Sequence, residues 1–238
     1  MDAKNTEDAP WRSGMQGARA NLAPGIALQL VALALVLGYY NLEGFHAALT
    51  RVAEIRSRMG TVFGVLSTAT FGGFLPFLYM RYRRRPAGTQ PQYDWIQGLA
   101  LTGFWAYKGF EVGLWYGFQA RMIGGGHDVA TVTIKVILDQ FVYCPVLAVP
   151  LTTVVYQAVD AHGRWAVLAS DLREQGWYRR RVLAVLIANI VLWVPAVAVI
   201  YALPTALQLP LQNIVLCFYT LVVAHQMRSD PDAVQASG

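Results

Sequence analysis

The 238-residue chain is predicted to fold as an all-α, polytopic transmembrane helix bundle. Three observations predict this class. Charged residues make up 14% of the chain, against about 25% in soluble domains. Mean hydropathy is +0.38. Six apolar segments are each near or above the ~20 residues that a membrane span needs. The segments are residues 24–42, 60–80, 95–119, 131–158, 182–202 and 206–226. Four to six of them are expected to be full spans.

The chain begins with a polar tail, residues 1–21, whose acidic residues are unlike a signal or transit peptide. Insertion into the membrane is therefore expected to depend on the first span, 24–42. Residues 43–58 have mixed charges and are expected to extend that first helix beyond the membrane. One transmembrane domain is expected over 22–228, followed by a polar tail over 229–238.

The third segment carries glycines and charges on different faces. Gly109, Gly113 and Gly117 are four residues apart, which lets another helix approach closely along that face. Lys108 and Glu111 are three residues apart and lie roughly opposite the glycines. We expect the glycine face to pack against a helix and the charges to meet a cavity or partner charges. The alternative is an internal Lys–Glu pair that only neutralises itself.

The fourth segment keeps charges at membrane depth, where they usually face a protein interior or a water-filled path. Lys135 and Asp139 are four residues apart and are expected to share a face, with Gln140 adjacent. Pro145 and Pro150 follow, and each frees a backbone carbonyl that needs another partner. The pattern indicates either the wall of a solute pathway or a structural kink.

A short amphipathic helix at the membrane surface is expected between the fourth and fifth segments, over residues 163–175. Trp165, Leu168 and Leu172 lie there at helical spacing.

Pro204 is expected to break the helix between the last two segments, which form two spans or one broken hairpin. Gln208, Gln212 and Asn213 follow the break. For these side chains, hydrogen bonding between helices is favoured over contact with a solute.

The distribution of positive charge predicts the orientation of the spans. With the N-terminus inside, most of the 19 Lys and Arg residues fall on the inner side. The outer loops would hold Arg51, Arg56, Arg58 and Arg121. This asymmetry favours six spans with both termini inside.

Other classes of function find no support in the sequence. The net charge of +5 comes from short arginine runs between apolar segments, so nucleic-acid binding is not expected. No nucleophile–base motif, phosphate-binding loop or zinc-protease motif is present, so no enzyme is predicted. The two cysteines and four histidines lack metal-ligand spacing, and no metal or cofactor is expected.

Two motifs suggest a family. The first is a glycine-containing stretch ending in Trp-Tyr, then an Arg, then Lys-x-x-x-Asp-Gln with a Pro five residues on. It comprises Gly109, Gly113, Trp115, Tyr116, Arg121, Lys135, Asp139, Gln140 and Pro145. The second is looser and comprises Asn189, Trp193, Pro195, Tyr201, Pro204 and Tyr219.

Over residues 95–226 this pattern resembles the Mpv-seventeen/peroxisomal membrane protein family of small integral membrane proteins. The chain departs from the family at Phe110, where a proline is usual, and at Lys108 and Glu111, where apolar residues are usual. The resemblance implies a channel-like activity for an unidentified solute and a peroxisomal, mitochondrial inner or vacuolar membrane. The excess of Arg over Lys and the abundant Ala indicate a bacterial source, which favours a bacterial cytoplasmic membrane.

The function expected from the sequence is a channel or pore-like protein for small solutes. Its pathway would be lined by Lys108, Glu111, Lys135, Asp139 and Gln140. The alternative is a non-transporting structural or interaction protein of the membrane, with these charges in internal pairs. The expected partners are the lipid bilayer and an unknown small solute, and a homo-oligomer is left open.

Overall fold

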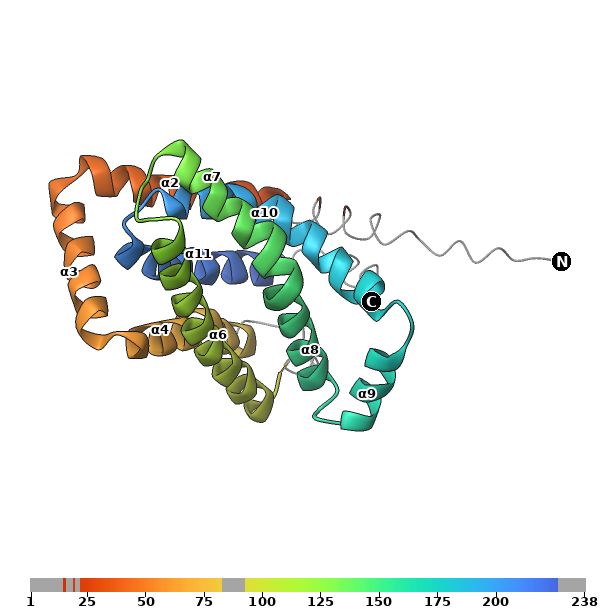
Figure 1. Cartoon of the computed structure of the whole chain (residues 1–238). Coiled ribbons are helices and arrows are strands. Elements are labelled where there is room, and N and C mark those ends of the chain that lie inside the picture. The colour runs from red at the N-terminus through yellow and green to blue at the C-terminus, as the bar shows by residue number, and fades with distance from the viewer. Residues whose placement is uncertain (1–14, 16–18, 20–21, 83–92, 227–238) are drawn as a thin grey trace. The chain divides into compact units, whose positions relative to one another are not determined.

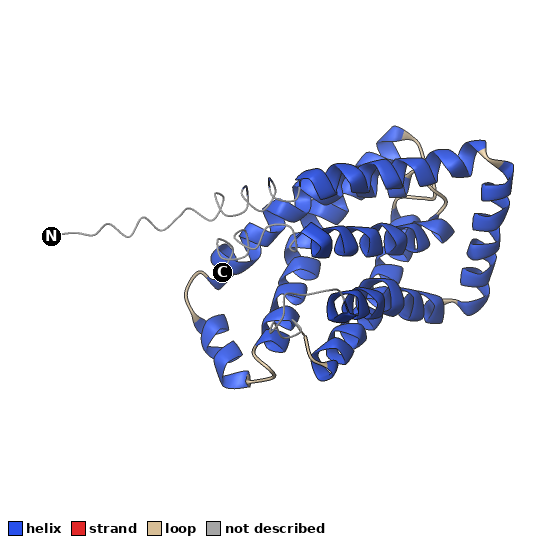
Figure 2. Ribbon diagram, turned by 180° about the vertical axis from the view of Figure 1, so that it is seen from behind, coloured by secondary structure: helices blue, strands red, loops and turns tan. Residues whose placement is uncertain are grey.

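The computed structural model describes residues 22–82 and 93–226, with residues 15 and 19 as isolated positions. Every regular element in these residues is a helix (Figure 2), which confirms the all-α class. All six predicted apolar segments are helical. Residues 83–92 and most of both predicted polar tails lie outside the described residues, and so does the Arg83–Arg85 run that the orientation argument used.

The helices follow one another with short connections. They are α2 (Leu22–Asn41), α3 (Glu43–Met59), α4 (Thr61–Thr68), η1 (Ala69–Phe74), α5 (Leu75–Tyr82), α6 (Trp95–Met122), α7 (Val129–Leu138), η2 (Asp139–Ala148), α8 (Val149–Asp160), α9 (Trp165–Arg173), η3 (Tyr178–Val182), α10 (Leu183–Tyr201) and α11 (Thr205–Gln226). The three η elements are π-helices that continue into α-helices.

Three helical stretches are long and apolar enough to cross a bilayer: Thr61–Tyr82, Val129–Asp160 and Tyr178–Tyr201. A fourth span is reached only if α2 and α3 together form one broken span. The described residues therefore support three or four spans, and the expected upper count of six is not confirmed.

The expectation that residues 43–58 extend the first helix is wrong. Leu42 takes an extended backbone conformation between α2 and α3, and the two helices meet at 102°. Figure 1 shows α3 running across from the end of α2 to the start of α4. The turn into α4 is made by Gly60, whose φ of +57° is readily available only to glycine.

The described residues divide into two compact units, which we describe separately. The first contains Met1–Ala23 and Ile137–Pro195, and the second contains Pro24–Val136 and Ala196–Gly238.

Acidic side chains fix the starts of α6 and α7 in the second unit. Asp94 accepts a hydrogen bond from the Gln97 amide, and Gln97 returns one to the Asp94 amide. Asp128 accepts from both the backbone amide and the hydroxyl of Thr131. These bonds satisfy donors that a helix start leaves open, and they hold the pKa of the Asp128 carboxyl below its usual value.

In the second unit, the α4–η1–α5 stretch packs antiparallel against α6 through glycines on both sides. The Gly64 and Gly109 backbones meet, Gly73 lies on Thr102, and Phe77 covers Gly98. Residue numbers rise along one helix as they fall along the other, so the contacts form one continuous interface. Glycine permits this close approach because it has no side chain.

The break between α10 and α11 confirms the effect expected of Pro204. α10 ends at Tyr201, and α11 begins at Thr205. Carbonyls in the break lack helical partners, and side chains from three helices supply donors instead. The bonds run from Tyr40 Oη to the carbonyl of Ala202 (2.7 Å), from Gln208 Nε2 to that of Leu203 (3.0 Å) and from Arg56 Nη1 to that of Thr205 (2.5 Å).

In the first unit, the π-helix η2 explains an unusual tyrosine contact. In a π-helix the N–H of residue i bonds the carbonyl of residue i−5, as the Val149 amide does to Cys144. The next donor in this register would be Pro150, which has no N–H. The carbonyl it leaves is that of Pro145, and the Tyr178 hydroxyl donates to it at 2.7 Å.

The helix expected over residues 163–175 is present as α9 (Trp165–Arg173). Its predicted apolar face is only partly buried. Leu168 is buried, while Trp165 and Leu172 are exposed.

Candidate functional site

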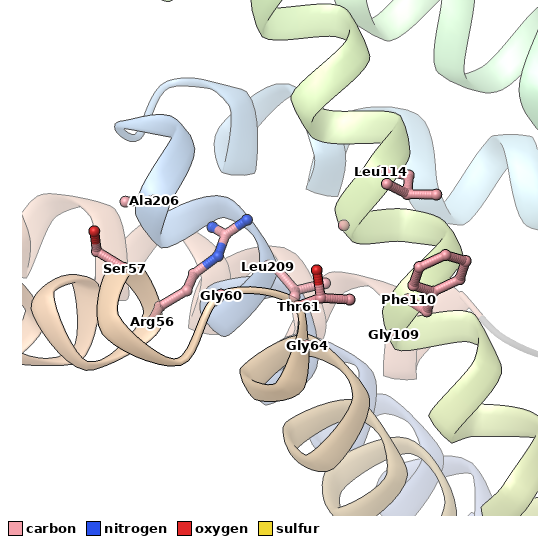
Figure 3. A pocket seen from close by; sticks show the side chains of 11 residues that line it. Arg56, Ser57, Gly60, Thr61, Gly64, Gly109, Phe110, Leu114, Ala206 and Leu209 are labelled. Atoms are coloured by element: carbon pink, nitrogen blue, oxygen red, sulfur yellow. The ribbon is translucent and has the colours of Figure 1, made fainter.

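The second unit contains a cavity of about 360 Å³ where α3, α4, α6 and α11 meet (Figure 3). Four helices far apart in the sequence contribute to its walls. The lining residues are Arg56, Ser57, Gly60, Thr61, Gly64, Gly109, Phe110, Gly113, Leu114, Ala206 and Leu209.

Glycines create the space. Gly64 and Gly109 bring α4 and α6 into backbone contact on one side of the cavity. One turn farther along α6, a methyl group added to Gly113 would meet no atom within 4 Å. The two helices are thus held together at Gly109, while a missing side chain at Gly113 leaves room between them and α11.

Arg56 supplies the only charge among the lining side chains. Figure 3 shows it extending from α3 toward α11, where it donates to the Thr205 carbonyl. A guanidinium has five N–H donors, so this bond leaves others available. The hydroxyls of Ser57 and Thr61 are the remaining polar side-chain groups of the lining, and none of the lining residues is acidic.

A polar network lies in the same helices. The Thr68 hydroxyl donates to Asn213 Oδ1 at 3.0 Å, and Asn213 Nδ2 donates to the Ser67 hydroxyl at 2.9 Å. The Tyr116 hydroxyl donates to Gln212 Oε1. The predicted role of Gln212 and Asn213 in hydrogen bonding between helices is confirmed, whereas Gln208 acts locally at the helix break.

Lys108 and Glu111 form the internal pair that the sequence analysis held as the alternative. Lys108 Nζ lies 2.6 Å from Glu111 Oε1, and the two side chains are 6% and 8% exposed. Neither residue lines the cavity. The expectation that the charged face of this helix meets a cavity is therefore wrong for this cavity, because the glycine face borders it.

The expected pairing of Lys135 with Asp139 is not formed. Lys135 is buried, and its Nζ has no hydrogen-bond partner within the described residues. Asp139 instead accepts a hydrogen bond from Gln140 Nε2 at 2.7 Å. Four-residue spacing assumes a continuous α-helix, and the chain changes to a π-helix at Asp139. The Lys135 carbonyl accepts from Gln119 Nε2 at 3.1 Å.

The residues of the family-like motifs do not gather into one site. Gly109 and Gly113 reach the cavity. The predicted close packing along the glycine face holds at Gly109 and is wrong at Gly113 and Gly117, where an added methyl group meets open space. Tyr116 packs edge-on against Tyr201, with ring centroids 5.5 Å apart.

The other residues of these motifs take positions in helices. Trp115 stacks on Phe118, and Arg121 is exposed in the last turn of α6. Asn189, Trp193 and Pro195 lie within α10, Pro145 within η2 and Tyr219 within α11.

The sequence analysis missed Arg56, Thr61 and Gly64 as cavity residues. Arg56 was placed in an outer loop because it lies in a charged stretch. A usable signal was present in Gly60 and Gly64, which have the same four-residue spacing as the glycines of α6.

Comparison of the chain with protein-family models, with curated proteins and with solved structures finds no match.

Proposed function

We propose that the protein is an integral membrane protein that passes small solutes in a channel-like manner, with the Arg56 cavity as the solute-binding site. The three apolar helices long enough to cross a bilayer are compatible with an integral membrane protein. The cavity is the observation that supports passage of a solute. Its volume lies at the small end of the range of ligand pockets.

The helix break beside the cavity supports the same proposal. Non-helical backbone at membrane depth is tolerated where it is buried in protein or lines a water-filled cavity. The break at Ala202–Thr205 ends next to Ala206, which lines the cavity. Donors from α2, α3 and α11 hold its carbonyls in place, so the cavity has a fixed wall there.

This proposal moves the pathway away from Lys108 and Glu111, whose charges neutralise each other. Lys135, Asp139 and Gln140 stay predicted pathway residues. Similarity to the Mpv-seventeen/peroxisomal membrane protein family and a bacterial cytoplasmic membrane likewise stay proposals.

Flux through liposomes containing the purified protein tests the proposal. We expect small polar solutes to leave these liposomes faster than protein-free ones. Gly113→Leu should reduce this flux, because the leucine side chain would grow into the cavity. Gly103→Leu is the matched control, since Gly103 lies on the exposed side of the same helix with open space around it. Equal flux through both variants would refute the role of the cavity.

A second candidate function is that of a non-transporting membrane protein with structural charges. The closed Lys108–Glu111 pair favours it, because a buried pair that needs no solute can serve packing alone. A well-folded wild-type protein that passes no solute of the panel would select this second candidate.

A further inference from the structure

We propose that the Arg56 cavity selects small oxyanions, of the carboxylate or phosphate class, over uncharged solutes. This inference rests on the proposed function and names the class of solute.

The charge of the lining carries the first step. Arg56 is the one cation in the lining, and no carboxylate lies among the lining side chains to neutralise it. The buried acid of α6, Glu111, is already paired with Lys108 and is not part of the lining. A half-buried guanidinium without an acidic partner favours an anion beside it.

The position of the guanidinium carries the second step. One N–H group is fixed on the Thr205 carbonyl at 2.5 Å, which holds the planar group against α11. The remaining N–H groups keep the fork geometry that binds a carboxylate or phosphate through two parallel hydrogen bonds. A lysine would lack this geometry, so the residue type fits an oxyanion more closely than a simple halide.

Neutral donors complete the site. Ser57 and Thr61 offer hydroxyl groups within the same lining. α4 begins at Thr61 and has no side-chain cap, so its first turn adds backbone N–H groups that need acceptors. These groups supplement the guanidinium, and the proposal depends on Arg56 and the cavity.

The size of the cavity sets the class of oxyanion. Its 360 Å³ corresponds to roughly ten molecules of liquid water at about 30 Å³ each. A carboxylate of two to four carbons fits with some hydration, and Phe110, Leu114 and Leu209 provide an apolar surface for its carbon atoms.

The first arm of the test measures binding, independently of flux. The full-length protein in phosphatidylcholine nanodiscs is heated at constant ionic strength with chloride, acetate or inorganic phosphate. Acetate and phosphate should raise the midpoint of unfolding in a saturable manner. Arg56→Gln should weaken this effect about tenfold or more, because it removes a charge-assisted bond. Arg56→Lys should weaken it less.

Arg58→Gln is the matched control. It removes the same charge from an exposed position of the same helix, outside the cavity, and should leave the oxyanion effect unchanged. An equal effect of acetate on the wild-type protein and on Arg56→Gln would overturn the proposal. Loss of the effect in Arg58→Gln would overturn it too, because a general surface charge would then explain the result.

The second arm measures selectivity with glycolate and glycerol, which are similar in size and differ in charge. Glycolate flux should fall in Arg56→Gln while glycerol flux persists. A parallel change of both fluxes would overturn the selection. If no solute passes but acetate still stabilises the wild-type protein through Arg56, the oxyanion site stands and the proposed function fails.

A third arm separates soluble oxyanions from lipid headgroups, which present the same phosphate chemistry. The heating experiment is repeated in nanodiscs containing phosphatidylglycerol. Stabilisation by free acetate in phosphatidylcholine supports a soluble ligand. Stabilisation by phosphatidylglycerol alone would assign the site to a headgroup and overturn its role in selecting solutes.

Discussion

Gly109 and Gly113 form a matched pair for testing how α4 and α6 pack. They are four residues apart on α6 and both line the cavity, yet only Gly109 meets a neighbouring backbone. A methyl group on Gly109 would overlap the Gly64 carbonyl oxygen, with the carbonyl carbon at 2.6 Å and Thr68 Cβ at 2.8 Å. Ordinary van der Waals contact begins at 3.4 Å. Backbone atoms cannot rotate away, so the two helices would have to separate.

The magnitude follows from comparing the two alanine variants. Replacing a helical glycine by alanine gains about 0.8–1 kcal/mol in helix propensity, and this term is common to both variants. Overpacking costs about 1–3 kcal/mol and applies only at Gly109. Gly109→Ala should therefore be less stable than Gly113→Ala by about 1–3 kcal/mol, and Gly113→Ala should be at least as stable as the wild type.

The assay is reversible unfolding of the protein in mixed micelles, followed by circular dichroism at increasing SDS fraction. The difference in free energy of unfolding between the two variants is the quantity of interest. Equal stability of both variants would refute the backbone contact between α4 and α6. Lower stability of Gly113→Ala than of Gly109→Ala would refute the assignment of open space to Gly113.

Further outcomes are expected in the same assay. Lys108→Met should lower the free energy of unfolding by about 3–5 kcal/mol, because it leaves Glu111 buried without its ion-pair partner, and Glu111→Met in the same chain should recover much of the loss. A double variant as unstable as the single one would contradict this pairing. Tyr178→Phe should cost about 1–3 kcal/mol by removing the donor to the Pro145 carbonyl, and no loss would indicate that another donor serves it. Gln208→Leu should cost a similar amount at the α10–α11 break, and a neutral result would show that the break needs no such donor.

The sequence predicted the elements well because local signals determine them. Apolar length located all six helical segments, and Pro204 predicted the break between α10 and α11. The three-residue spacing of Lys108 and Glu111 was enough to predict their pairing as an alternative, since both lie in one uninterrupted α-helix.

The site itself could not be predicted because it depends on which helices meet. The glycine spacing of α6 predicted a close helix contact but not that Gly64 would supply it at Gly109 alone. The Lys135–Asp139 expectation failed because the sequence carries no simple signal for a change from α- to π-helix. Arg56 enters the cavity through the 102° bend between α2 and α3, which hydrophobicity alone does not predict.

Thiol labelling at Gly113 tests most directly whether solutes use the cavity. Gly113→Cys is introduced with Gly103→Cys as its control, and both proteins are reconstituted in liposomes. A small, charged, membrane-impermeant thiol reagent should label Gly113→Cys and reduce its solute flux, because the cavity is hydrated and lies on the pathway. It should leave Gly103→Cys unlabelled, since that position faces lipid. The native Cys144 and Cys217 are buried, and the unmodified protein provides their background. Absence of labelling at Gly113→Cys, or complete labelling with unchanged flux, would contradict the account.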